Sequence, residues 1–248
     1  MQRTLRRIAA GLICTMLLGS GAPVWAAVLA AMFAGALAGA VTGLLHTALG
    51  IPSILAGILT QLMLYSVNLF ILGGKSLVAI DPRAHDLWVH MSDNPASIGA
   101  MLILVTVVIL CLWQFFYTEI GLTLKSTGDN PDMSRAQGVN VKLNKVVGLS
   151  IANGIVALSG AMLAQYKGSA NINDGRGAIV IGLAAVIIGE VIFGKIFRNF
   201  ALKLLAVAIG SIIYYVVIQA VVSLSGINSN YLKLLSAVIV ALFLAVPY

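Results

Sequence analysis

Apolar runs separated by short polar connections fill most of the chain. A helix needs about 20 mostly apolar residues to cross the hydrocarbon core of a bilayer. Eight runs reach or approach that length, the first and the sixth only marginally: residues 8–21, 24–45, 54–73, 98–117, 146–165, 179–193, 204–224 and 232–246. The pattern predicts an all-α, polytopic integral membrane protein with about eight transmembrane helices, folded as a single transmembrane domain over residues 1–248.

The composition supports a lipid-embedded chain. Of the 248 residues, 60% are hydrophobic and 9% are charged, whereas soluble domains have about 25% charged residues. The net charge of +7 is scattered between apolar runs rather than collected on a basic face with aromatics, so nucleic-acid binding is excluded. Cys14 and Cys111 lack the spacing of a redox or metal site and are expected to be two membrane-buried thiols.

The N-terminus allows two interpretations. Arg3, Arg6 and Arg7 precede an apolar run, as in a signal peptide that is cleaved near Trp25. The alternative is a first membrane helix, and we favour it because Pro23-Val24-Trp25 makes a poor cleavage site. Cleavage would leave seven helices in the same arrangement.

The basic residues predict the orientation, since cytoplasmic segments carry an excess of Lys and Arg. With the N-terminus inside, the outer segments hold Lys75, Arg83, Lys167, Arg176 and Lys233. The inner segments hold twice as many: Arg3, Arg6, Arg7, Lys125, Arg135, Lys142, Lys145, Lys195, Arg198 and Lys203. Both termini are therefore expected in the cytoplasm.

Two of the predicted helices carry further information. Gly35, Gly39 and Gly43 repeat every four residues, which predicts a tight seam with a neighbouring helix. The helix that begins near Pro52 carries Gln61, Tyr65 and Asn68 on one face. Lipid offers no hydrogen bonds, so these polar groups must face protein or a water-filled path.

Motifs that would indicate nucleotide binding, metal binding or catalysis are weak. Gly74-Lys75-Ser76 resembles the end of a phosphate-binding loop, but Leu69 stands where that motif needs glycine. His46, His85 and His90 lack metal-ligand spacing, and no Ser/His/Asp or Cys/His set is suggested. We therefore expect no metal, no cofactor and no enzyme activity.

The inner segment at 118–145 contains the most specific pattern. Asp129 or Asn130 can cap a short helix that has Pro131 at its first position, and Gly138 can end it. Such a helix of about two turns suits docking on a cytoplasmic partner, although a solvated connector fits these residues as well.

Residues 121–140, with Gly128-Asp129-Asn130-Pro131, Ala136 and Gly138-Val139-Asn140, resemble the cytoplasmic loop of permease subunits of bacterial ABC importers. The branch is that of branched-chain amino-acid and ribose permeases, and residues 42–47, 51–60 and 158–166 look most like tryptophan/tyrosine transport permeases. Members usually carry another hydrophobic segment before residue 8, so the chain is expected to be an N-terminally shortened form.

The resemblance implies an inner-membrane permease for a small solute, with an aromatic amino acid favoured. Its partners would be a cytoplasmic ABC ATPase that hydrolyses ATP, an extracytoplasmic substrate-binding protein, membrane lipid and a second permease, identical or related. Segment 118–145 would be the coupling loop, in which Pro131 and Gly138 give shape and Arg135 contacts the ATPase. A non-transporting scaffold is a further alternative.

The resemblance also makes the membrane-embedded polar residues candidates for solute contact. Gln61, Tyr65 and Asn68 are favoured over Asn153 and Gln165, and hydrogen bonds between helices are the alternative for each. Glu190 is the only acid in a predicted span; Lys195 or Arg198 could compensate it as an interface carboxylate, or it could act in gating. An ion-coupled secondary transporter or channel, using Glu190 for proton coupling, is the rival function.

Overall fold

The computed structural model describes residues 13–14, 17–18, 23–71, 76–79, 95–172, 178–193 and 199–225. Its elements are α2 (Val24–Thr47), α3 (Ser53–Ile71), β1 (Leu77–Ala79), α4 (Pro95–Phe116), α5 (Glu119–Asp129), α6 (Pro131–Ala136), α7 (Val141–Lys167), β2 (Ser169–Asn171), α8 (Ala178–Phe193) and α9 (Phe200–Ser225). The chain divides into two compact units, residues 1–107 with 114–176 and residues 108–113 with 177–248. The single domain expected over residues 1–248 stays a prediction.

Five of the described helices, α2, α3, α4, α7 and α9, are long and apolar enough to cross a membrane. Each coincides with a predicted run, which confirms the all-α membrane class. Helix α8 has 16 residues and is about 24 Å long, somewhat short of a full span. Of the remaining predicted runs, 232–246 lies outside the described residues, and 8–21 is described only at four helical positions, Ile13, Cys14, Leu17 and Leu18.

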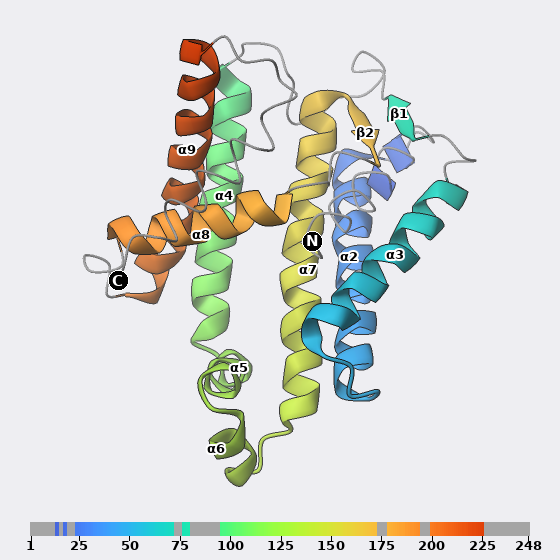
Figure 1. Ribbon diagram of the computed structural model, residues 1–248, viewed down its shortest axis with the longest axis vertical. Helices are drawn as coiled ribbons and strands as arrows, with labels where there is room; N and C mark the ends of the chain where they lie inside the picture. Colours follow the sequence, from blue (N-terminus) through green and yellow to red (C-terminus); the bar gives the residue numbers. More distant parts are fainter. Residues whose placement is uncertain are drawn as a thin grey trace. The chain divides into compact units, whose positions relative to one another are not determined.

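Helices α2 and α7 lie side by side in the first unit (Figure 1). Added Cβ atoms at Gly35, Gly39 and Gly43 would all collide with α7; at Gly39 the Cβ would lie 2.8 Å from Ser150 Cα, and at Gly43 it would lie 2.8 Å from Val146 Cα. The contacts on α7 move backwards as those on α2 move forwards, so the helices are antiparallel. The tight seam expected from the glycine repeat is confirmed.

Helix α3 contacts this pair at two places. Near its middle, Thr60 Oγ1 lies 2.9 Å from Thr42 Oγ1 of α2. Near its end, Tyr65 and Leu69 pack against an apolar cluster that also takes in Val78 of β1. The buried members of that cluster come from the end of α7 and the segment after it: Ala164, Ala170 and Ile172.

Two short strands lie in the connections between helices: β1 follows α3, and β2 follows α7. β1 and β2 pair antiparallel, with Val78 opposite Ala170, and Ile172 N donates to Ser76 O over 2.9 Å. Gly168, at a φ of +62°, ends α7 and lets the chain turn directly into β2. The sequence pattern missed both strands, because three residues are too few to show an alternation.

The second unit contains α8 and α9, which pack through glycines. A Cβ atom at Gly189 would lie 2.6 Å from Ala206 O. Tyr214 of α9 is fully buried in one cluster with Ala184 and Ile188 of α8. This close approach fixes α8 against its neighbour within the unit.

We expect Gly39→Val to lower the free energy of unfolding by about 1–3 kcal/mol, the usual cost of overpacking, because the new side chain must displace α7 backbone. Gly99→Ala is the matched control, since a Cβ there meets nothing within 4 Å and alanine favours a helix by about 0.5–1 kcal/mol. Unfolding of both variants by SDS in mixed micelles measures the difference. Equal midpoints would contradict the seam.

Candidate functional site

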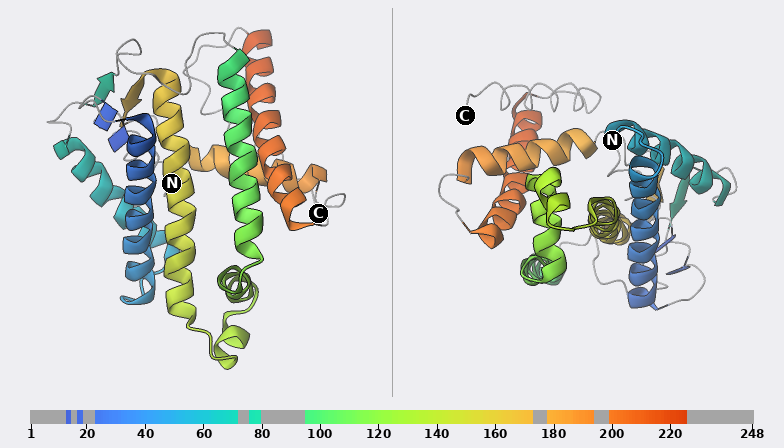
Figure 2. Two further views of the ribbon diagram at one scale, coloured as in Figure 1. Left: turned by 180° about the vertical axis from the view of Figure 1, so that it is seen from behind. Right: turned by 90° about the horizontal axis from the view of Figure 1, so that it is seen from below.

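The segment between α4 and α7 contains two helices rather than one short helix in a loop (Figure 2). The hydroxyl of Thr118 accepts from Gly121 N over 3.3 Å and caps α5. A Cβ atom at Gly121 would lie 2.6 Å from Phe116 Cα, so glycine allows the sharp turn out of α4. Helix α5 was not predicted, although Thr118 followed by an acidic first turn is a helix-start signal.

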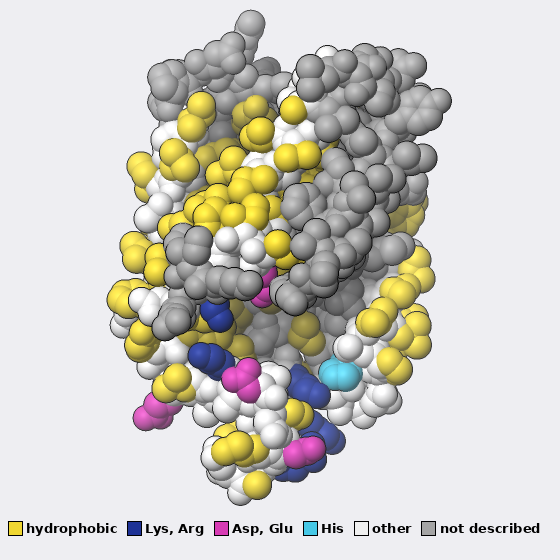
Figure 3. Space-filling view, turned by 60° about the vertical axis from the view of Figure 1, so that its left-hand side comes forward, with side chains coloured by type: hydrophobic (Ala, Val, Ile, Leu, Met, Phe, Trp, Pro, Cys, Tyr) yellow, Lys and Arg dark blue, Asp and Glu magenta, His cyan; other side chains and the backbone are white. Residues whose placement is uncertain are grey.

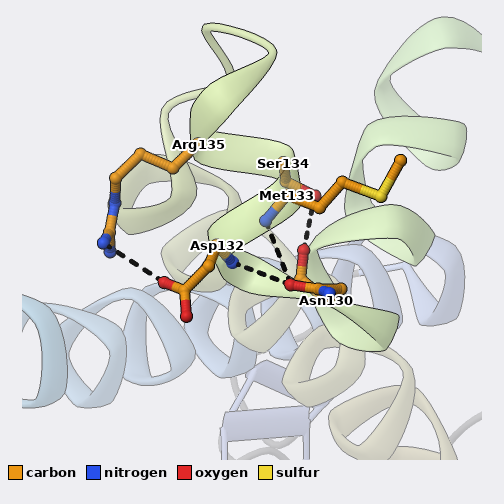
Figure 4. A network of polar contacts seen from close by, with 5 residues as sticks. All are labelled: Asn130, Asp132, Met133, Ser134 and Arg135. Carbon is orange, nitrogen blue, oxygen red and sulfur yellow. Dashed lines mark hydrogen bonds and ion pairs between the residues drawn. The ribbon is translucent and has the colours of Figure 1, made fainter.

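Helix α6 has the ends that its sequence predicts (Figure 4). Asp129 and Asn130 were the two candidates for its N-cap, and Asn130 is the one that caps the helix. Its Oδ1 accepts from Asp132 N and Met133 N, over 3.1 and 3.0 Å. Pro131 occupies the first helical position, where no N–H is needed. At the other end Gly138 adopts a φ of +84°, which closes the helix in a glycine-dependent turn.

One polar contact holds α6 to α5, and a second holds α5 to α7. Ser134, with 1% of its surface exposed, lies with its Oγ 3.2 Å from Ser126 Oγ of α5. Asn144 Nδ2 of α7 donates to Thr127 Oγ1 of α5 over 3.2 Å. Force on α6 can therefore pass through α5 to α7. These contacts could not be predicted from the sequence, since the partners of each residue lie on other helices.

The rest of α6 faces outward. Met133 exposes 60% of its surface, and the Arg135 guanidinium lies 3.4 Å from the exposed Asp132 carboxylate. Gly128 and Asp129, at the end of α5, are also exposed. Lys, Arg, Asp and Glu side chains gather at the lower end of the face in Figure 3; the exposed cations of this segment are Lys125, Arg135, Lys142 and Lys145. An apolar side chain set among charges is typical of a docking surface.

The three favoured solute contacts lie together on α3. Asn68 is buried, with 3% of its surface exposed, while Gln61 and Tyr65 are half-buried. Gln61 Oε1 and Asn68 Nδ2 are both sealed from solvent and have no hydrogen-bond partner within the ranges the structure describes. Buried amides normally find partners, so this face differs from ordinary helix packing.

The other candidates lie elsewhere. Asn153 sits in the α2–α7 seam, and its amide donates to Leu149 O of its own helix. Gln165 is buried near the end of α7, with its Nε2 3.9 Å from Cys14 Sγ. Glu190 is exposed on α8, in the second unit, and its expected partners Lys195 and Arg198 lie outside the described residues. Among the described residues, no cluster of three or more acids, histidines or cysteines could hold a metal ion.

Asn130→Ala should speed hydrogen exchange at the first amides of α6 about fivefold, because a lost N-cap costs roughly 1 kcal/mol. Asp129→Ala is the control, since the neighbouring Asn130 supplies the capping oxygen. Exchange of the detergent-purified chain, followed by mass spectrometry of peptides covering residues 131–137, measures the effect. Equal exchange in both variants would show that the cap does not hold the helix.

The chain is similar in sequence to known permease proteins. Residues 7–247 match the family described as branched-chain amino acid transport system / permease component. A tyrosine transport system permease protein of Clostridioides difficile is 37% identical over 202 residues, 82% of this chain and 66% of that protein. An uncharacterized protein of Rickettsia prowazekii is 31% identical over 196 residues (79% and 69%), and the autoinducer 2 import system permease protein of Salmonella typhimurium is 27% identical over 183 residues (72% and 52%).

The matches thus cover between about half and just over two thirds of these relatives' own length. No solved structure matches the chain. A family match over nearly every residue, together with the membrane helices, decides the classification. The chain belongs to the family of branched-chain amino acid transport permeases.

Proposed function

We propose that the chain is the transmembrane permease subunit of an ATP-driven ABC importer in the bacterial inner membrane. The observation that carries the proposal is α6, a capped, exposed helix that is bonded to α5, which is in turn bonded to α7. A membrane protein needs such a rigid projection when another protein must push on it. The permease would hydrolyse no ATP itself; that reaction belongs to the ATPase subunit.

The solute we propose is an amino acid, with an aromatic one favoured. The relative named as a tyrosine transport system permease supports this choice, because it is 37% identical over most of the chain. A separate extracytoplasmic binding protein would deliver the solute. A second permease, identical or related, would complete the path, and membrane lipid would cover the remaining apolar faces.

Coupling follows from the contacts of α6. Met133 would enter an apolar groove of the ATPase, and Arg135 would pair with acidic groups at its rim. Gly128, Asp129, Asn130, Pro131 and Gly138 would set the shape and stiffness of the projection. Because Ser134 contacts α5 and Asn144 joins α5 to α7, closure of the ATPases would move α7 together with α2, its partner in the glycine seam.

This role requires α6 and both termini to lie in the cytoplasm. The exposed Lys125, Lys142 and Lys145 beside α6 support that orientation through the excess of cations on cytoplasmic segments. The β1–β2 pair would then lie outside. Glu190, exposed within the apolar α8, would serve as a gating or interface carboxylate, because a carboxylate facing lipid alone would cost about 2.5–3.5 kcal/mol.

We expect Met133→Asp to weaken capture of the ATPase about fivefold or more, since losing a buried interface anchor costs upwards of about 1 kcal/mol. Leu77→Asp on β1 is the control: Leu77 is also an exposed apolar residue, but it lies on the proposed outer side. Co-purification of the tagged permease with its co-expressed ATPase, followed by ATP-dependent amino-acid uptake in vesicles, measures both steps. Full capture and uptake by Met133→Asp would refute the docking role of α6.

A further inference from the structure

Two side-chain amides on α3 each carry a buried atom that lacks a hydrogen-bond partner among the described residues. Gln61 Oε1 and Asn68 Nδ2 are closed off from solvent without a hydrogen-bond partner among the described residues. By contrast, the buried hydroxyl of Thr60, one residue before Gln61, contacts both Ala56 O and Thr42 Oγ1. The Thr60 hydroxyl is therefore satisfied within the protein, whereas Gln61 Oε1 and Asn68 Nδ2, on the following two turns, are not.

Lipid does not supply the missing partners, because the amides point away from it. The neighbouring side chains Leu62 and Val67 expose 59% and 50% of their surfaces and form the outward side of the helix. Gln61 Oε1 and Asn68 Nδ2 face inward and are sealed. A donor and an acceptor that face neither lipid nor a protein partner require water or a solute.

We propose that Gln61, Tyr65 and Asn68 form a solute-contacting surface for a net-neutral amino acid, closed in this conformation. Helix α3 carries no charged side chain that could compensate a charged solute. The side-chain amides instead offer an N–H donor for a carboxylate and a C=O acceptor for an ammonium group, and the Tyr65 ring between them offers an apolar face. The inference relies on the proposed transport function only for the kind of solute.

The spacing indicates how the surface would be used. Gln61 and Asn68 are seven residues apart, which is about 10 Å along the helix axis. The α-amino and α-carboxyl groups of one amino acid are attached to the same carbon, so together they span much less than the separation of the two helix positions. We therefore expect the two amides to act at successive positions of a solute that moves along α3.

The outer strands determine when the surface opens. Tyr65 and Leu69 pack against the cluster formed by Ala164, Ala170 and Ile172, and this contact holds the end of α3 against the end of α7 and β2. Solute can reach Asn68 only when α3 separates from this cluster. Access should therefore depend on the transport cycle.

The test uses single cysteines in the full chain, with Cys14→Ala and Cys111→Ala as background. Gln61→Cys and Asn68→Cys are compared with the matched neighbours Leu62→Cys and Val67→Cys, which lie at the same depth on the outward side. Membrane vesicles containing the co-expressed ATPase and binding protein are treated with a cationic methanethiosulfonate reagent during ATP hydrolysis. L-tyrosine and L-lysine are the two protecting probes.

The first two variants should react at least about tenfold faster than their neighbours, equivalent to about 1.4 kcal/mol in activation free energy. L-tyrosine should slow their reaction, and L-lysine, which carries a net charge, should not. Equally slow labelling of all four cysteines, or labelling that neither amino acid slows, would overturn the inference. Labelling slowed by L-tyrosine in vesicles that show no ATP-dependent uptake would support this surface while contradicting the importer.

Discussion

The backbone-to-backbone packing of α2 against α7 is the contact on which the first unit depends. Helices in lipid gain no hydrophobic advantage from associating, so close van der Waals contact between small residues must hold them. Gly39 and Gly43 allow α2 to approach the backbone of α7 where any Cβ atom would collide. Because the two helices interlock along this line, they are expected to move as one body.

Helix α7 links this seam to both candidate functional regions. At one end Asn144 bonds α5, and Leu124 of α5 packs over Gly148. At the other end Gly168 turns the chain into β2, where the Tyr65 and Leu69 side chains of α3 pack. A push on α6 and an opening of the α3 surface can thus be two ends of one displacement of α7.

Several features of this arrangement are visible in the sequence because they depend on local chemistry. Run length alone locates the five long helices, and the four-residue glycine repeat reveals the seam. The Asn130-Pro131 step and Gly138 define both ends of α6, since capping and positive φ are properties of single residues. The coupling role of those residues, unlike their geometry, stays a proposal.

Other features depend on contacts between distant residues. The start of helix α5 is signalled locally by Thr118 and Glu119, but its polar residues, such as Thr127, are typical of a loop until their partners on other helices are known. The β1–β2 pair joins strands of three residues each from separate connections. Thr60 and Asn68 look alike in the sequence as polar residues on α3, but only the structure shows that Thr60 has an interhelical partner whereas Asn68 Nδ2 has none in the described chain.

The side of the membrane on which α6 lies tests the central claim most directly. Met133→Cys and Leu77→Cys, each in a background of Cys14→Ala and Cys111→Ala, can be labelled with a membrane-impermeant maleimide in right-side-out and in inverted vesicles. Our account predicts that Met133→Cys reacts only in inverted vesicles and Leu77→Cys only in right-side-out ones. Reaction of Met133→Cys in right-side-out vesicles would place α6 outside the cell, beyond the reach of any ATPase, and would contradict the account.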